Sequence, residues 1–225
     1  MGWFIKFIDS SLGKKLIMAL TGLFLSLFLI EHLIGNLLLL KSDGGEAFTA
    51  YGEFLASPNN YVARVLEIGL FLVFIYHIIN GIRLWWSNRK ATQVRYKSND
   101  PSANSSFFSR FMVWSGSITF IFLVIHLRSF FFPYRFGDPG NTMYQGVVEA
   151  FSSPVYSIFY IIAMIFLTFH LVHGVQSAFQ TLGIRHKKYT PFIKKFGIFF
   201  AIIICAGFAL IPIYFLLTGG KIICL

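Results

Sequence analysis

Four histidines recur at regular spacing in four apolar segments of the sequence. His32 and His77 are 45 residues apart, and His126 and His170 are 44 residues apart. An imidazole inside a lipid bilayer is unfavourable unless a partner satisfies it, so histidines in membrane segments indicate function. Neutral imidazole is also the commonest metal ligand. Two imidazoles on each of two octahedral irons would use all four side chains, which predicts two bis-histidine haem sites.

The composition predicts an all-α membrane protein. The chain has 225 residues, of which 56% are hydrophobic and 12% are charged, whereas soluble domains carry about 25% charged residues. A helix needs about 20 apolar residues to cross the bilayer core. Five segments reach that length and predict five transmembrane helices within a single domain, 1–225. They are residues 16–40, 61–86, 107–132, 154–181 and 191–217. We expect the first four, with one histidine each, to form the haem-binding bundle.

The basic residues predict the orientation of the chain in the membrane. With the N-terminus inside, the inner segments hold 14 of the 19 lysines and arginines. The positive-inside rule therefore places the N-terminus in the cytoplasm and the C-terminus outside. Anionic lipid or an acidic partner accounts for the net charge of +10, so no nucleic-acid partner is expected.

The remaining features predict no second site. Residues 1–15 lack the cleavage site of a signal peptide. Cys205 and Cys224 fit no metal spacing, and a disulfide between them is disfavoured because Cys205 lies inside the last span. His186, in a basic turn, is expected to be an exposed surface residue.

An internal two-fold repeat relates the first pair of spans to the second, at an offset of about 94 residues. The pairs related in this way are His32 with His126, Gly22 with Gly116, His77 with His170, and Gly81 with Gly174. Glycine is common in transmembrane helices, which is one explanation of the glycine pairs. The functional explanation is that a glycine lets a flat macrocycle lie against the helix backbone.

Depth in the membrane predicts how the histidines pair. Each lies about 16 residues into its span, and successive spans run in opposite directions. His77 and His170 should therefore form an inner pair, and His32 and His126 an outer pair. The glycines fall at depths where two porphyrins need room. Gly22 and Gly116 lie at the inner depth, Gly69 lies at the outer depth, and Gly81 and Gly174 lie one turn from the inner ligands.

Several alternatives remain open at the level of the sequence. His173 is one turn from His170 and is the competing ligand, although it occupies the position held by Asn80 in the other repeat. A transporter with proton-relay histidines and no cofactor is the rival from another class. The haem propionates need basic partners at the helix ends. The candidates are Arg83 and Arg89 on the inside and Lys41, Arg64 and Arg128 on the outside.

The motifs around the histidines resemble those of a known family. Leu-Ile-Glu-His32-Leu-Ile-Gly-Asn, Ile-Tyr-His77-Ile-Ile-Asn-Gly, Val-Ile-His126-Leu, Phe-His170-Leu-Val-His-Gly and Gly-Gly-Glu46-Ala-Phe are similar to the five-helix dihaem cytochrome b subunit of succinate dehydrogenases and fumarate reductases. The resemblance implies two haem b groups in a subunit of the bacterial cytoplasmic membrane. It also implies a flavoprotein (FAD) subunit, which would carry the succinate site, and an iron–sulfur subunit, both on the cytoplasmic face.

The resemblance further implies that menaquinone or another quinone exchanges electrons near the outer haem. An acidic residue at the outer end of the first two spans is tied to quinone chemistry in the family. Glu46, Glu53 and Glu67 compete for that role, with Glu46 as the first choice, and Asn36 and Tyr51 are candidate hydrogen-bond donors.

The same cofactors would also fit other functions, and the sequence leaves these open. The complex could reduce fumarate instead of oxidising succinate, or the anchor could serve a hydrogenase or a formate dehydrogenase. The fourth span has Thr168 rather than an acidic residue two positions before its histidine, so a proton route there is not evident. The Phe-rich helices would permit a dimer or trimer of the complex.

Overall fold

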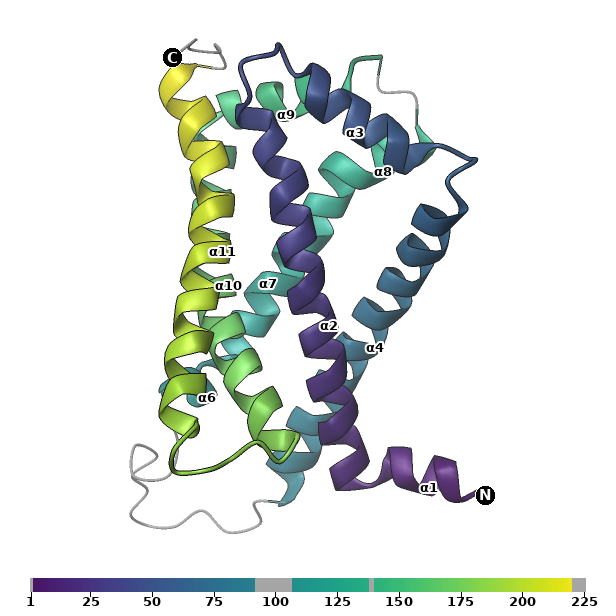
Figure 1. Ribbon diagram of the computed structural model, residues 1–225, viewed down its shortest axis with the longest axis vertical. Helices are drawn as coiled ribbons and strands as arrows, with labels where there is room; N and C mark the ends of the chain where they lie inside the picture. The colour runs from purple at the N-terminus through teal and green to yellow at the C-terminus, as the bar shows by residue number, and fades with distance from the viewer. Residues whose placement is uncertain (1, 92–106, 138–139, 220–225) are drawn as a thin grey trace.

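The computed structural model describes residues 2–91, 107–137 and 140–219, and this part of the chain is helical without strands (Figure 1). Five helical segments are long and apolar enough to cross a membrane, which confirms the predicted fold class. They are Ser11–Leu40, Tyr61–Lys90, Met112–Phe136, Pro154–Thr181 and Thr190–Thr218. The main helices of these spans are α2 (Ser11–Leu37), α4 (Tyr61–Ala91), α7 (Met112–His126), α10 (Pro154–Thr181) and α11 (Thr190–Thr218).

The first span begins earlier than the predicted residue 16, because a cap rather than hydropathy sets its start. The Ser10 side chain accepts a hydrogen bond from the Gly13 backbone N–H at 2.9 Å, which satisfies one of the donors left free at a helix N-terminus. A short helix, α1 (Trp3–Asp9), precedes it and runs across the base of α2 (Figure 1). A side chain on Gly13 would collide with the Phe7 carbonyl, so glycine permits this sharp turn.

The third span extends beyond the predicted end at residue 132. A π-helical segment, Leu127–Phe131, follows α7 and leads into α8 (Phe132–Phe136). Pro133 falls in the first turn of α8, where a missing N–H breaks no helical bond. At its inner end the span is interrupted at Phe111, between α6 (Phe107–Arg110) and α7. The predicted end at residue 132 is therefore too early, because the helical segment continues through Pro133 to Phe136.

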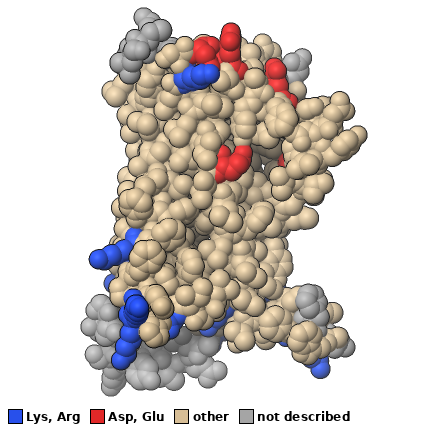
Figure 2. Space-filling view, in the orientation of Figure 1, with Lys and Arg blue, Asp and Glu red and all other residues tan. Residues whose placement is uncertain are grey.

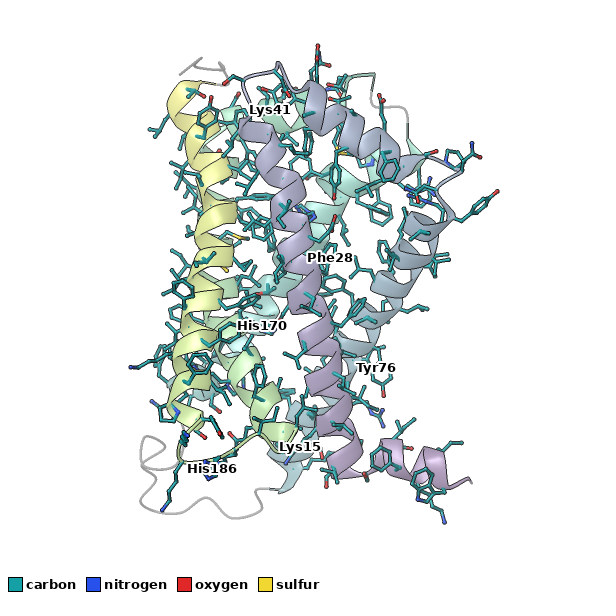
Figure 3. The ribbon with its side chains drawn as sticks, in the orientation of Figure 1. Lys15, Phe28, Lys41, Tyr76, His170 and His186 are labelled. Atoms are coloured by element: carbon teal, nitrogen blue, oxygen red, sulfur yellow. The ribbon has the colours of Figure 1, made fainter. Side chains whose placement is uncertain are left out.

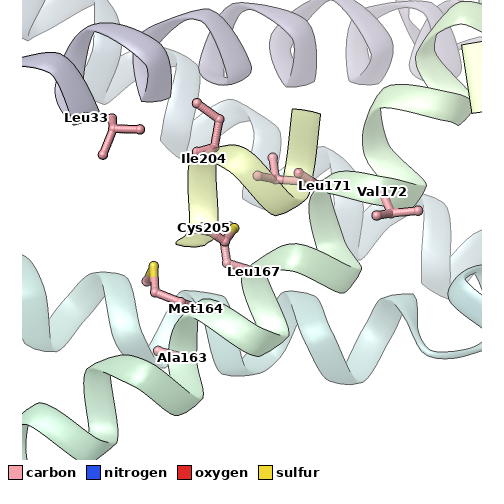
Figure 4. Close-up of a cluster of buried hydrophobic side chains, with 9 residues drawn as sticks. Leu33, Ala163, Met164, Leu167, Leu171, Val172, Ile204 and Cys205 are labelled. Carbon is pink, nitrogen blue, oxygen red and sulfur yellow. The ribbon is translucent and has the colours of Figure 1, made fainter. Parts of the chain in front are cut away.

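The centre of the bundle is formed where α10 packs against α2, α7 and α11. Figure 4 shows this buried cluster, which joins Leu33 of α2 to Leu167 of α10 and Ile204 of α11. The fifth helix therefore completes the core on one side of the four histidine-bearing spans.

Two short helices cover the upper end of the bundle in Figure 1. They are α3 (Glu46–Ala56) and α9 (Met143–Ser152), in the segments that connect the spans. Phe48 and Val147 bury their side chains against Phe215 of α11. Gly45 starts α3 with φ +87°, and a side chain there would overlap the Tyr144 ring, so both conformation and space require glycine.

Most basic side chains visible in Figure 2 lie over the lower end of the molecule, where α1 lies. Acidic side chains lie over the upper end, together with one basic group, and further acidic atoms lie at mid-height. Many large hydrophobic side chains of the spans are exposed, among them Leu27, Leu72 and Phe199, as expected for a surface that faces lipid.

Candidate functional site

The four histidines meet in two pairs inside the bundle. The ring centroids of His77 on α4 and His170 on α10 are 6.3 Å apart, and the rings are inclined at 68°. Those of His32 on α2 and His126 on α7 are 5.8 Å apart and inclined at 87°. The structure thus brings together the pairs named by the depth argument, and each histidine comes from a different spanning helix.

The two pairs lie at different depths. In Figure 3, His170 is in the half of the bundle that ends at Lys15 and His186, whereas Lys41 lies at the opposite end. A Cβ atom on Gly22 would be 3.4 Å from Cε1 of His77, so Gly22 marks the depth of this inner pair on α2. His32 follows ten residues later, which separates the two pairs by about 15 Å along the helix.

Thr21 fixes the orientation of His77. Its hydroxyl donates to the Ile17 carbonyl at 2.8 Å and lies 3.0 Å from Nδ1 of His77. A hydroxyl has a single hydrogen, so its oxygen accepts from Nδ1–H of the imidazole. The lone pair of His77 is then on Nε2, the nitrogen free to bind a metal.

Tyr160 has the corresponding position at the outer pair. Its hydroxyl lies 3.2 Å from Nδ1 of His126 and 3.2 Å from the Tyr156 hydroxyl. When Tyr160 donates to Tyr156 and accepts from His126, Nε2 of His126 also keeps its lone pair. The other outer histidine, His32, stacks on Phe28 with ring centroids 5.2 Å apart.

The inner partner of His77 has an unsatisfied polar atom. Nδ1 of His170 is buried and has no hydrogen-bond partner. Buried polar groups are nearly always satisfied, and an exception points to a missing water, ion or ligand. His173, the competing candidate, is half-buried one turn away, and the ring that contacts His77 is that of His170. His186 is exposed, as expected.

The spacing of both pairs suits two imidazoles on opposite sides of one metal ion. A ligating nitrogen lies about 2.0 Å from its metal, so the two ring centroids would be about 6 Å apart. Two uncharged rings in edge-to-face contact have similar separations. The distance between the centroids therefore does not distinguish metal ligation from direct packing of the rings. The hydrogen bonds at Nδ1 of His77 and His126 favour ligation, because they leave Nε2 of these two rings free to bind a metal.

Two of the five predicted glycines lie beside a histidine ring. A Cβ on Gly116 would be 3.5 Å from the His170 ring, in the same relation as Gly22 to His77. Gly69 and Gly174 have no atom within 4 Å of an added Cβ, and Gly81 faces the Met18 methyl at 3.2 Å. Gly22 and Gly116 therefore adjoin a histidine ring and Gly69 and Gly174 have open space, whereas a Cβ on Gly81 would press against the Met18 methyl.

Three of the five basic candidates for propionate binding already have acidic partners. The ion pairs are Lys41 with Asp43 at 3.3 Å, Arg64 with Glu67 at 2.5 Å, and Arg83 with Asp9 at 2.7 Å. Arg89 stacks over the Trp85 ring at 5.7 Å, and Arg128 is exposed on the π-helical segment.

The residues predicted to bind quinone have different surroundings in the structure. Glu67 is held between Arg64 and Arg135, and Glu46 and Glu53 are exposed on α3. Tyr51 of α3 reaches back to the first span and donates its hydroxyl hydrogen to the Glu31 carboxylate. Burial and this hydrogen bond raise the pKa of the Tyr51 phenol above its ordinary value. Asn36 donates to the His32 carbonyl at 2.7 Å.

Sequence reasoning missed Glu31, Thr21 and Tyr160. For Glu31 a signal was present, because a carboxylate inside a span and next to a histidine is rare in membrane helices. Thr21 and Tyr160 carry no spacing signal, since each meets a histidine on another helix.

The fold and the paired histidines define a multi-pass helical membrane protein with two pairs of histidine side chains at two depths. Comparison with known sequences is consistent with this class. Residues 16–99 match the family described as succinate dehydrogenase/fumarate reductase transmembrane subunit. The succinate dehydrogenase cytochrome b558 subunit of Bacillus subtilis (strain 168) is 28% identical over 180 residues, which cover 79% of this chain and 81% of that protein. The chain is therefore similar to the membrane-anchor subunits of this family. No solved structure matches it.

Proposed function

We propose that the chain is the dihaem cytochrome b anchor of a succinate dehydrogenase, and that it carries electrons between an iron–sulfur subunit and a membrane quinone. The observation that carries this proposal is the presence of two histidine pairs, at 6.3 Å and 5.8 Å, formed by four different spanning helices. The name of the Bacillus subtilis relative supports the same function.

His77 and His170 would hold the inner haem, and His32 and His126 the outer haem. A haem with two histidine ligands supplies one-electron redox chemistry and has no open coordination position for oxygen. Gly22, Gly69, Gly81, Gly116 and Gly174 would leave room for the two porphyrins.

The chain's own residues position the ligands and exclude water. Thr21 and Tyr160 hold the rings of His77 and His126 by accepting from Nδ1–H, and such partners orient a ligand and increase its basicity. The aromatic side chains of Phe122 and Phe130 pack against His126 and keep the outer pair away from water.

The partners would be a flavoprotein carrying FAD and an iron–sulfur subunit, both on the cytoplasmic face of the bacterial inner membrane. The basic lower end in Figure 2 supports this orientation, with the N-terminus inside and the C-terminus outside. Succinate would be oxidised on the flavoprotein and not on this chain.

Menaquinone, or another quinone, would bind near the outer haem. Tyr51 and Asn36 are the better supported of the predicted candidates, because Tyr51 hydrogen-bonds Glu31 next to His32 and Asn36 hydrogen-bonds the His32 carbonyl on the same helix. Glu67 is the weaker one, because two arginines already neutralise it. The family description includes fumarate reductases, so the reverse direction is the second candidate function.

The test is a redox experiment on the purified three-subunit complex. We expect succinate to reduce the haems and a menaquinone analogue to reoxidise them. Haems that succinate leaves oxidised, while dithionite reduces them, would contradict the assignment to succinate dehydrogenase and point to a different electron donor.

A further inference from the structure

The first helix, α1, leaves the bundle sideways. It covers seven residues, Trp3–Asp9, and in Figure 1 it projects from the base of α2 away from α10 and α11. The turn into α2 is held by the Ser10 hydroxyl, which donates to the Phe7 carbonyl at 2.6 Å and accepts from the Gly13 N–H. A helix this short is not stable in water by itself, so α1 needs a surface to pack against.

The sequence of α1 is amphipathic. Five of its seven residues are apolar, and the two charged ones, Lys6 and Asp9, are three positions apart and share one face. Trp3 and Phe7 lie on the apolar side, where their rings stack with centroids 6.0 Å apart. Trp3 is nevertheless 79% exposed and Ile5 is 49% exposed. The apolar side of α1 is therefore left largely uncovered by the part of the chain that the structure describes.

An ion pair joins the lower end of α4 to α1. Arg83 of α4 contacts Asp9 of α1 at 2.7 Å, and α4 then continues through Trp85 and Trp86. Both tryptophans are exposed, like Trp3. Three of the four tryptophans in the sequence therefore lie at this end of the bundle. Tryptophan is enriched where a membrane meets water, because its ring is amphipathic.

The same region is strongly basic. Residues 1–15 and 80–91 contain six basic residues and one acidic residue, and the acidic one is already in the ion pair with α4. Arg89 and Lys90 each lie over a tryptophan ring of α4, at 5.7 Å and 5.3 Å from its centroid. Lys6, Arg89 and Lys90 are exposed, and none of them pairs with a carboxylate among the described residues. Cations that flank a span in this way attract anionic lipid.

We propose that α1 lies flat in the membrane surface and that, together with the last turns of α4, it binds the head groups of anionic phospholipids. The apolar side of α1 enters the boundary between acyl chains and head groups, while Lys6, Arg89 and Lys90 contact lipid phosphates. Basic residues on one face and tryptophan or phenylalanine on the other are typical of helices that lie on a membrane. In the proposed orientation this is the cytoplasmic leaflet.

The direction of α1 favours lipid over a partner protein. A subunit docked on the end of the bundle would cover the ends of the spans, whereas α1 extends beyond them to one side (Figure 1). The surface of α1 and α4 is also cationic and apolar at once, with Trp3 and Ile5 exposed near the basic side chains. A phospholipid matches both properties, because its anionic head group adjoins its acyl chains.

The first experiment measures lipid binding by the purified complex in uncharged detergent. The probe is dansyl-labelled phosphatidylglycerol, which accepts energy from nearby tryptophans, and unlabelled phosphatidylglycerol or phosphatidylcholine competes with it. The test variant is Lys6→Gln/Lys90→Gln. The matched control is Lys187→Gln/Lys188→Gln, which removes the same charge from the exposed turn between α10 and α11. Lys188 also lies over an aromatic ring, that of Tyr189 at 5.7 Å, as Lys90 does.

We expect the Kd for phosphatidylglycerol to rise about tenfold or more in Lys6→Gln/Lys90→Gln, because each cation near the membrane surface contributes to the attraction. The control should stay within twofold of wild type, and phosphatidylcholine should compete poorly. Equal weakening in the two variants would overturn the proposal, since it would show only a general attraction between a basic end and anionic lipid. A Kd within twofold of wild type in both variants would overturn it as well.

The second experiment needs no variant. The wild-type complex is placed in nanodiscs of phosphatidylglycerol or of phosphatidylcholine, and cleavage after Lys6 by endoproteinase Lys-C is followed by mass spectrometry. We expect cleavage to be several-fold slower in phosphatidylglycerol, because anionic head groups hold α1 in the membrane surface. Equally fast cleavage in both lipids would overturn the proposal. Equally slow cleavage would also overturn it, and would show that α1 is covered without the help of anionic lipid.

Discussion

Thr21→Val is a near-isosteric change that removes a single hydrogen-bond acceptor from the inner histidine pair. The Thr21 hydroxyl lies 3.0 Å from Nδ1 of His77, so the variant leaves the ring N–H buried without a partner. An unsatisfied buried donor costs about 1–3 kcal/mol. Loss of such an outer partner typically weakens metal binding about 10–100-fold, which corresponds to about 1.4–2.8 kcal/mol. The two estimates agree, and we expect inner-haem affinity to fall by that factor.

The assay is transfer of haem from the purified complex to excess apomyoglobin, followed in the visible spectrum. We expect the inner haem to be lost preferentially in Thr21→Val, while the outer haem serves as an internal reference. Thr21→Ser keeps the hydroxyl and should behave as wild type. Thr168→Val is the matched control, because the Thr168 hydroxyl bonds the Met164 carbonyl at 2.8 Å and not a histidine. Equal haem retention in Thr21→Val and Thr168→Val would refute the assigned role of Thr21.

Three further predictions test other parts of the structure. His170→Ala and His126→Ala should each leave one haem per chain when the iron is quantified, and a variant that kept two would exclude that residue as a ligand. Gly45→Val should lower the unfolding temperature in detergent, because φ is +87° and such strain costs about 1–3 kcal/mol; an unchanged Tm would show that the turn can relax. Asp9→Asn should shift the Tm little, because its ion pair with Arg83 is about half exposed and exposed pairs contribute about 0–1 kcal/mol; a large loss would show that α1 stabilises the bundle.

The spans and the histidine pairing could be predicted because both depend on periodic properties of the chain. Hydropathy gives the number of spans, and the 1.5 Å rise per residue converts a position in a span into a depth. The depths of His32 and His126, and of His77 and His170, then lead to the pairs that lie together in the structure.

The ends of the spans were predicted less well because they depend on local backbone geometry. Ser10 caps the first span before its apolar stretch begins. The π-helical turn at Leu127–Phe131 carries the third span past Pro133. Hydropathy contains no information about either feature.

The residues that support the histidines could not be predicted, because their partners come from other helices. Thr21 and His77 are 56 residues apart in sequence, and Tyr160 and His126 are 34 apart. The ion pair of Arg83 with Asp9 depends in the same way on how α1 and α4 approach each other. The pair of Arg64 with Glu67 is local, because the two residues are three positions apart on α4. Glu31 differs from Thr21 and Tyr160, because a carboxylate inside an apolar span can be recognised in the sequence. Hydropathy alone does not say what such a carboxylate does.

The most direct test of the central claim is the number of haems per chain in the purified complex, measured by pyridine haemochrome with a reduced-minus-oxidised spectrum. Two b-type haems per chain, both reduced by succinate, are the predicted result. A colourless protein would contradict it and would mean that the histidine pairs serve protons or a transported substrate.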